Sequence, residues 1–179
     1  MLDVAQVEVL RGPQGTRYGA NALGGLINIS TNSPDDSRTL KIRAGVAEYG
    51  TTNLGLIANA SLSDTLNARL AVGKHESNGY INNGFLDLDD TNGRDEQTAR
   101  AKLTWQAADN WQIDLSFANI DIDNGYDAFS LDNTRHTLTD EPGFDRQDST
   151  YDAAKRTWRL DQLDIELLIN GAESDLDYG

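Results

Sequence analysis

Carboxylates are the most abundant reactive side chains in this chain, and their neighbours in the sequence can be compared with the motifs of metal sites and enzymes. The 179 residues include 29 Asp and Glu but only 2 His and no Cys. Without Cys, neither a disulfide nor a Cys-based zinc site can form. His75 and His136 are too few and too far apart to suggest a metal cluster. A serine hydrolase is also unsupported because no Gly-x-Ser-x-Gly elbow is present. We therefore predict a protein that is not an enzyme and needs no cofactor.

One acidic run, Asp87-Leu88-Asp89-Asp90-Thr91-Asn92-Gly93, invites a calcium interpretation. An EF-hand loop needs Gly at its sixth position and Glu at its twelfth. Counted from Asp87, these positions hold Asn92 and Thr98, so the EF-hand template fails. A looser divalent-cation site stays open. The other acidic residues cluster in predicted loops, where charge runs usually form a solvated surface.

Net charge and hydropathy exclude two further classes of protein. The formal charge of −14 argues against nucleic acid as a partner, because that contact needs a basic surface. No apolar run approaches the length of about 18 residues that a transmembrane helix requires. Membrane β-strands remain compatible with this composition, because strict alternation hides their apolar face from any average along the sequence.

Residues 6–29 carry the most informative pattern, which predicts a strand, a sharply bent turn and a second strand. Val7 and Val9 alternate with polar neighbours, as in a half-buried strand. The turn is punctuated by residues that permit or impose bends, namely Gly12, Pro13, Gly15 and Gly19. A β-rich run resumes after Gly24 and Gly25. Phosphate-binding loops do not fit, because no Lys-Ser/Thr pair follows the last glycine and the glycine spacing differs from a dinucleotide fingerprint.

This stretch resembles the end of the plug domain of TonB-dependent outer-membrane receptors, whose signature reads E-V-L-R-G-P-x-G-x-x-Y-G, then small residues, then G-G-x-I-N-I. The motif residues that we carry over as plug or plug–barrel contacts are Glu8, Arg11, Gly12, Pro13, Gly15, Tyr18, Gly19, Gly24, Gly25 and Asn28. Arg17 departs from the pattern, since the family usually has an apolar residue there. The resemblance implies that Arg11 locks plug to barrel through charge-assisted hydrogen bonds. The plainer alternative is a solvated turn arginine.

The residues after 37 must supply the elements that hold this motif, and they alternate strictly between apolar and polar. Five segments show the alternation, at residues 40–46, 54–62, 66–72, 99–105 and 111–117. Such alternation predicts membrane strands, which are about 9–11 residues long. A further strand or two near the C-terminus changes phase around Asp161-Gln162, which indicates either a very tight turn or a bulge. The alternatives stay open at this point.

The connections between these segments predict which end faces which side of a membrane. Ser63–Thr65 and Ala107–Asn110 are short, whereas residues 77–95 and 123–155 are long. Outer-membrane barrels have short periplasmic turns and longer extracellular loops. If the first strand runs outward, both long connections fall on the extracellular side. A soluble β-sandwich also produces alternating strands, but it does not predict this parity.

Alternation also assigns side chains to the two faces of the predicted sheet. The basic residues predicted to face the barrel lumen are Lys41, Arg43, Arg69, Arg100 and Lys102. They would pair with plug carboxylates or guide an anionic ligand. Trp105 and Trp111 flank the second short turn on the apolar face, where an aromatic belt at the membrane interface is expected. The alternative for both Trp residues is the core of a soluble sheet.

We therefore predict an all-β chain: an antiparallel membrane β-barrel fragment of about six or seven strands, not closed, preceded by the last strands of a plug domain. The expected organisation is residues 1–31 as the end of the plug, 32–37 as a linker and 38–179 as barrel strands. We also expect a fragment, because a signal peptide, a TonB box and the front of the plug are not seen in the sequence. A plugged transporter has about 22 strands.

The resemblance implies TonB-dependent uptake of a scarce ligand across the outer membrane of a Gram-negative bacterium. The commonest substrates of this receptor family are ferric siderophores, and cobalamin, haem and glycans are the alternatives. Expected partners are TonB with its inner-membrane motor, the small ligand and outer-membrane lipid, but not nucleic acid. A structural or adhesive barrel that transports nothing is the alternative, and an outer-membrane hydrolase would need a converging Ser-His pair.

Overall fold

The computed structural model of the chain describes residues 2–18, 23–130 and 132–179, and of Arg17 only the backbone. It divides into two compact units, residues 1–33 and residues 34–179. Among the described residues, no helix has both the length and the apolar character needed to cross a membrane.

The first unit is a β-hairpin with one helical turn at its tip. Strand β1 (Val4–Arg11) pairs antiparallel with β2 (Gly25–Thr31), and the short α1 (Gly15–Tyr18) lies in the connection. The register runs from Val4 opposite Thr31 to Arg11 opposite Gly25. The predicted strand, turn and strand are therefore present, and the described motif residues lie in the two strands and in the connection between them.

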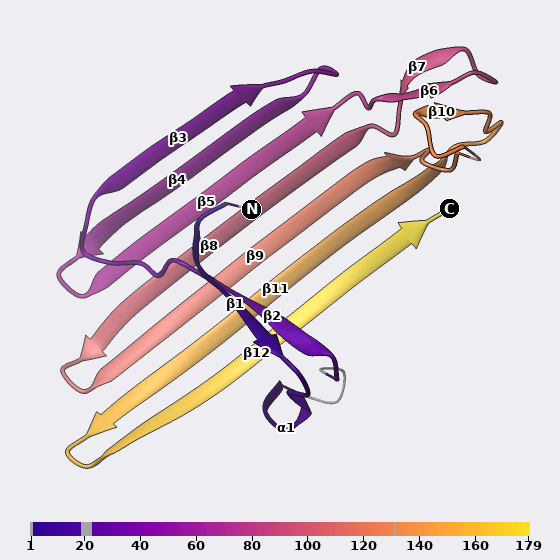
Figure 1. Cartoon of the computed structure of the whole chain (residues 1–179). Helices are drawn as coiled ribbons and strands as arrows, with labels where there is room; N and C mark the ends of the chain where they lie inside the picture. Colours follow the sequence, from indigo (N-terminus) through magenta and orange to yellow (C-terminus); the bar gives the residue numbers. More distant parts are fainter. Residues whose placement is uncertain (1, 19–22, 131) are drawn as a thin grey trace. The chain divides into compact units, whose positions relative to one another are not determined.

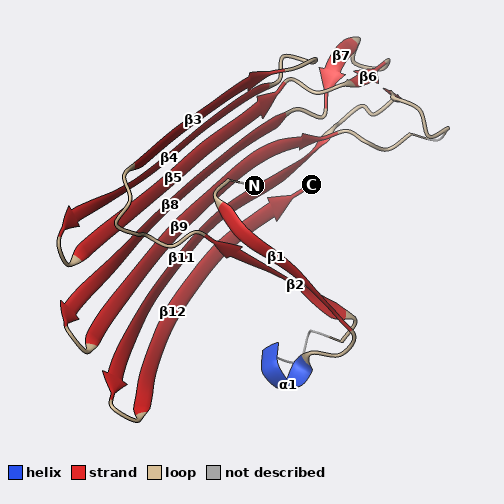
Figure 2. Cartoon of the chain, turned by 60° about the vertical axis from the view of Figure 1, so that its left-hand side comes forward, coloured by secondary structure: helices blue, strands red, loops and turns tan. Residues whose placement is uncertain are grey.

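The second unit contains a single antiparallel sheet of seven strands in the order β12-β11-β9-β8-β5-β4-β3 (Figure 1). Figure 2 shows this sheet as one curved layer. Its strands are β3 (Thr39–Val46), β4 (Thr52–Ser63), β5 (Leu66–Ser77), β8 (Arg94–Ala108), β9 (Trp111–Tyr126), β11 (Gly143–Leu160) and β12 (Leu163–Tyr178). The five predicted strand segments lie in β3, β4, β5, β8 and β9. The prediction of an all-β, unclosed antiparallel sheet of six or seven strands is confirmed.

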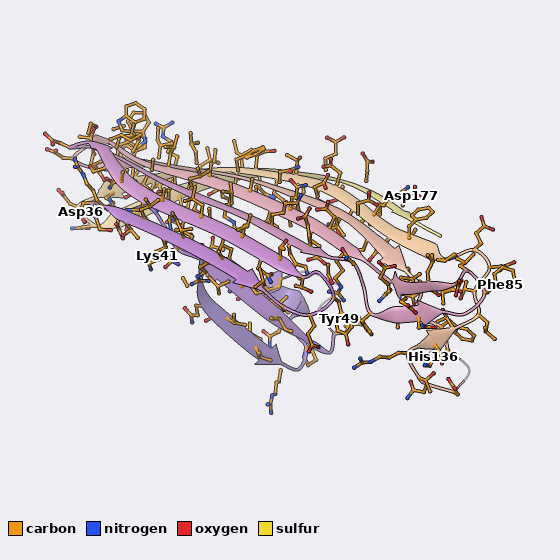
Figure 3. The ribbon with its side chains drawn as sticks, turned by 90° about the horizontal axis from the view of Figure 1, so that it is seen from above. Asp36, Lys41, Tyr49, Phe85, His136 and Asp177 are labelled. Carbon is orange, nitrogen blue, oxygen red and sulfur yellow. The ribbon has the colours of Figure 1, made fainter. Side chains whose placement is uncertain are left out.

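Short and long connections lie at opposite ends of this sheet. We call the end with residues 64–65, 109–110 and 161–162 the turn end, and the end with residues 47–51, 78–93 and 127–142 the loop end. In Figure 3, Asp36 lies at the turn end, whereas Phe85 and His136 lie at the opposite end. The loop end also carries a small sheet formed by β6 (Ile81–Asn83), β7 (Leu88–Thr91) and β10 (His136–Thr137).

The predicted extent of the long connections was wrong. The segment 123–155 is mostly strand, because β9 continues to Tyr126 and β11 begins at Gly143. The residues of β11 before Ala153 are mostly polar on both faces, apart from Phe144 and Tyr151, so they show no regular alternation. They still pair through the backbone, for example Asp148 opposite Asp121. Backbone pairing does not depend on side-chain polarity, and it carries these strands beyond the apolar band.

The open question at Asp161-Gln162 has a clear answer. Leu160 lies opposite Leu163, and Trp158 lies opposite Ile165. The connection is therefore a two-residue turn without a bulge. Because directly opposed residues share a face of a sheet, Trp158 and Leu160 of β11 stand on the same side as Leu163 and Ile165 of β12.

Very little of the apolar surface is buried. The buried apolar residues of the described chain are Ile57, Ala71 and Ile81, whereas Leu40 and Leu167 are 68% and 55% exposed. A single layer has no second layer to cover its apolar face. A large uncovered apolar surface marks an interaction with a membrane or a partner.

Candidate functional site

Glu8 and Asn28 hold the motif hairpin together across its two strands. They are register partners, and the Asn28 amide donates to a Glu8 carboxylate oxygen at 2.8 Å. The Gln6 amide donates to the other Glu8 oxygen at 3.1 Å. Both carboxylate oxygens are thus occupied within the hairpin, which gives Glu8 and Asn28 a structural role that the motif alone did not reveal.

Two motif glycines have backbone conformations that other residues rarely adopt. Gly12 has a φ of 83° and Gly25 a φ of 142°. A Cβ on Gly25 would lie 2.6 Å from the carbonyl oxygen of Leu10, so a side chain would push the hairpin apart. At Gly15 and Gly24 a Cβ would meet open space, and their need for glycine is not explained by this unit.

The remaining motif residues lie around the tip of the hairpin. Arg11 and Pro13 have exposed side chains at the end of β1, and Tyr18 closes α1 through its backbone N–H, which donates to the Gln14 carbonyl at 3.0 Å. Gly19 lies outside the described residues. Within the described part of residues 1–33, no carboxylate pairs with Arg11. Its proposed lock with a barrel carboxylate stays a prediction.

The strand register places all five predicted basic residues on one face of the seven-stranded sheet. Arg69 lies opposite Lys102, and Ala71 lies opposite both Arg100 and Ile57. Ile57 in turn lies opposite Lys41, and Arg43 follows two positions later on β3. We call this side the basic face. That it lines a lumen stays a prediction.

Two carboxylates on the basic face, those of Asp114 and Glu166, accept hydrogen bonds from neighbouring strand residues. Asp114 accepts from the Thr104 hydroxyl at 2.8 Å and from the Gln112 amide. Glu166 on β12 accepts from Lys155 at 3.2 Å. These contacts show that the basic face also carries hydrogen-bonded polar and acidic side chains from β8 to β12.

Sequence reasoning missed Asn59, which fixes the segment that leads into β3. This side chain is buried on β4, and its amide donates to the carboxylate of Asp35 at 2.8 Å and to the Ser37 carbonyl at 2.6 Å. Hydrogen bonds from the Ser37 hydroxyl and backbone are the main reason that the pKa of Asp35 lies below its ordinary value, and the charge of Arg69 adds to this effect. The signal in the sequence was that Asn59 lies on the face of its strand that alternation predicts to point into the barrel.

The opposite side of the sheet, which we call the apolar face, gathers the tryptophans near the turn end. Trp105 lies opposite Ile113, and Trp111 lies opposite Trp158. The Trp111 and Trp158 rings are 6.3 Å apart between centroids. Trp158 was not among the predicted belt residues, because the phase of β11 could not be read from the sequence.

Asp127 is the buried centre of the loop end, and sequence reasoning missed it as well. It is 3% exposed and accepts hydrogen bonds from Thr91 at 2.7 Å, Asn83 at 2.9 Å and Thr137 at 3.1 Å. Burial by itself raises the pKa of this carboxyl, but these donors outweigh burial and lower the pKa below its ordinary value. Asp127 therefore joins residues 78–93 to residues 127–142.

The acidic run at residues 87–93 forms part of the same loop end. Asn92 accepts the backbone N–H of Asp127 at 3.1 Å, and Asp89 accepts from Asn82. Within the described ranges, no group of three or more His, Asp or Glu side chains is arranged to hold a metal ion. The run thus contributes to loop structure.

An aromatic and cationic cluster also lies at the loop end. Arg135 donates to the Tyr49 hydroxyl at 2.8 Å and stands 5.6 Å from the centroid of the Tyr80 ring. The two tyrosine rings are 5.9 Å apart. Three separate connections therefore meet at these side chains.

Comparison with known proteins gives consistent matches over parts of larger receptors. No family model matches the chain. It is 53% identical over 47 residues to a pesticin receptor of Yersinia enterocolitica, which covers 26% of the chain and 7% of that protein. It is 26% identical over 123 residues to a vitamin B12 transporter of Vibrio vulnificus, covering 69% of the chain and 20% of the transporter.

Solved structures agree on the fold. The ferric yersiniabactin uptake receptor of Yersinia pestis superposes with a TM-score of 0.86 at 22% identity, covering 98% of the chain and 29% of the receptor. The ferric-catecholate import receptor of Escherichia coli gives a TM-score of 0.81 at 18% identity, with 98% and 29% coverage. The chain spans less than a third of each of these proteins. By its sequence matches and its fold, the chain corresponds to a part of the TonB-dependent outer-membrane receptors, which reside in the outer membrane of Gram-negative bacteria.

Proposed function

We propose that this chain serves TonB-dependent import of a ferric siderophore across the outer membrane, as part of a receptor energised by TonB and its inner-membrane motor. The observation that carries the proposal is the motif hairpin followed by an unclosed amphipathic sheet, an arrangement that matches the ferric yersiniabactin uptake receptor over 98% of the chain. The alternative, a structural or adhesive barrel that transports nothing, would lack the plug motif.

The proposed division of labour follows the two units. Residues 1–31 are the end of the plug, residues 32–37 are a linker, and residues 38–179 are barrel strands. The uncovered apolar face supports lipid contact, and the opposite, basic face would then line the lumen. The loop end would be extracellular, because it carries the longer connections.

A ferric siderophore is the preferred substrate class, and cobalamin is the second candidate. A pesticin receptor is 53% identical over 47 residues, and the two solved structures named above are described as a ferric yersiniabactin uptake receptor and a ferric-catecholate import receptor. The longest of these sequence matches is nevertheless to a vitamin B12 transporter. The Tyr49, Tyr80 and Arg135 cluster favours a ligand that presents negative charge and flat rings.

Uptake assays separate the candidates. The complete receptor that carries this chain is expressed in a strain without its own siderophore and cobalamin receptors, with and without TonB. We expect TonB-dependent uptake of iron-55 supplied on a panel of siderophores, and no uptake of labelled cobalamin. Uptake of cobalamin without uptake of any ferric siderophore would make cobalamin the substrate. Absence of any TonB-dependent uptake across haem, glycan and siderophore panels would favour the barrel that transports nothing.

A further inference from the structure

Arg156 is a basic residue on the apolar face, in the part of β11 near the turn end. Its register partners are Ile113 on β9 and Leu167 on β12. Its guanidinium lies 3.8 Å from the centroid of the Trp111 ring and 5.7 Å from that of Trp158. The two indoles therefore hold a fixed positive charge among apolar side chains.

Two other strand cations on this face have carboxylate partners. Lys74 pairs with Glu76 at 2.5 Å, and Arg146 pairs with Asp123 at 2.7 Å. Among the described residues, no carboxylate pairs with Arg156. Its exposed guanidinium is therefore open to an anion from outside the described chain.

The place of Arg156 along the strand suggests where that charge comes from. Arg156 is followed by only four residues of β11 before the turn at Asp161-Gln162. At about 3.3 Å per residue and a strand tilt of about 45°, it lies roughly 10 Å in depth from that turn. An Arg on the lipid face costs about 2–4 kcal/mol at the midplane but about 0–1 kcal/mol near an interface. The long Arg stem reaches toward the headgroups while the indoles stay at their level.

We infer that Arg156, Trp111 and Trp158 form a binding site for the phosphate of an anionic phospholipid headgroup in the leaflet at the turn end. The planar fork of Arg matches phosphate oxygens in a bidentate manner, and stacking on the indoles pre-orders it. The inference rests on the proposed membrane placement of the sheet. Lipopolysaccharide shares the phosphate chemistry, but it would have to reach the turn end rather than the loop end.

Tryptophan fluorescence gives a local test, because all three Trp residues of the chain, Trp105, Trp111 and Trp158, lie on this face. In the complete receptor, Trp residues outside this chain are replaced by Phe, and folding is checked by the heat-dependent shift in gel mobility. The protein is reconstituted into vesicles with chain-brominated phosphatidylglycerol or chain-brominated phosphatidylcholine in a common unlabelled background. Bromine quenches only nearby indoles, so the ratio of quenching reports local lipid preference.

We expect brominated phosphatidylglycerol to quench about fivefold more effectively per lipid than phosphatidylcholine, which corresponds to about 1 kcal/mol for one basic residue at an anionic surface. Arg156→Gln should abolish the preference, and Arg156→Lys should keep part of it. Lys155→Gln, which removes the neighbouring cation on the opposite face, should leave the lipid preference unchanged.

Equal quenching by both lipids in the native protein overturns the inference while the membrane placement stands. No quenching by either lipid would instead contradict the membrane placement itself. Added lipid A that displaces brominated phosphatidylglycerol would assign the site to lipopolysaccharide and overturn the inference.

Discussion

At the scale of residues, the motif hairpin combines side chains whose roles are visible with one whose role is not. Glu8 and Asn28 satisfy each other across the strands, and Gly25 must be glycine because a Cβ would meet the Leu10 carbonyl. Arg11 has no such local task. Its exposed guanidinium at the strand end is the part of the motif that is free to act outside the hairpin.

We predict that Arg11→Ala in the complete receptor weakens contact between plug and barrel and reduces ligand uptake several-fold. The physical reason is the loss of charge-assisted hydrogen bonds, each worth about 1.5–3 kcal/mol when desolvated. Uptake and the pH dependence of plug unfolding are measured together. Arg38→Ala, which removes an exposed arginine just after the linker, serves as the control. Unchanged uptake with an unchanged pH profile in Arg11→Ala would show a merely solvated turn arginine.

A second residue-scale prediction concerns Asp127. Because its pKa in the folded state is lowered, its ionised form stabilises the loop end above the ordinary value of 3.8, and this contribution is lost as pH falls below that value. Hydrogen exchange of residues 78–93 and 127–142, corrected for intrinsic rates, should accelerate below about pH 4. Asp127→Ala should accelerate it at every pH, because the unsatisfied donors cost about 1–3 kcal/mol.

The exposed Asp140 provides the matched control for this experiment. Asp140→Ala should leave both the exchange rates and their pH dependence as they are in the native protein. If Asp127→Ala behaves like Asp140→Ala, the carboxylate does not hold the two loops together.

At the scale of elements, the connections have a consistent polarity. Three tight turns share one end of the sheet, and residues 47–51, 78–93 and 127–142 share the other. A two-residue turn fixes the register of its strands, so the turn end is defined with little freedom. The loop end has room for extra structure, which it uses for the small sheet of β6, β7 and β10.

Sidedness follows as a testable prediction. Single Cys substitutions at the exposed positions Asp89 and Asp140 should react with a membrane-impermeant maleimide on intact cells, whereas those at Asp64, Asp109 and Asp161 should react only after permeabilisation. The absence of native Cys in the chain keeps its background low. Labelling of Asp64 or Asp109 on intact cells, with none at Asp89 or Asp140, would invert the topology.

At the scale of the whole molecule, the second unit is one curved layer with two chemically different faces. The apolar face carries leucines, isoleucines and tryptophans that no other described layer covers, whereas the opposite face carries the five basic residues. Such a layer is stable only where something apolar covers one side and something polar the other. A lipid bilayer and a hydrated, plug-filled lumen meet both requirements.

The basic face leads to a prediction about its two central arginines. Replacing Arg69 and Arg100 by Gln in the complete receptor should lower barrel stability if they pair with plug carboxylates, which is the outcome we expect. Weaker transport at unchanged stability, with greater sensitivity to salt, would instead assign them to guiding an anionic ligand. Thermal unfolding and uptake at two salt concentrations distinguish these results, and no change in either property would count against the lumen assignment.

The sequence by itself determined the elements that carry a strong periodic signal. Alternation from Leu40 to Phe117 defined five strands and the residues on each face, since the side-chain period of a strand is two. The irregular motif from Glu8 to Ile29 indicated its hairpin and its family, because few other structures need those glycines at that spacing. The short connections Ser63–Thr65 and Ala107–Asn110 were also visible in the sequence, and both lie at the turn end.

Only the tertiary structure decided what depends on pairing between distant strands. The polar half of β11 has no periodic signal, so its strand was visible only through its backbone partners on β9 and β12. The sheet face on which Trp158 and Arg156 lie could be assigned only once the turn at Asp161-Gln162 had fixed the register of β11 and β12. Asp127 and Asn59 acquire their roles from donors and acceptors 10 to 44 residues away. Sequence spacing cannot show such contacts, because they arise when separate loops and strands meet in space.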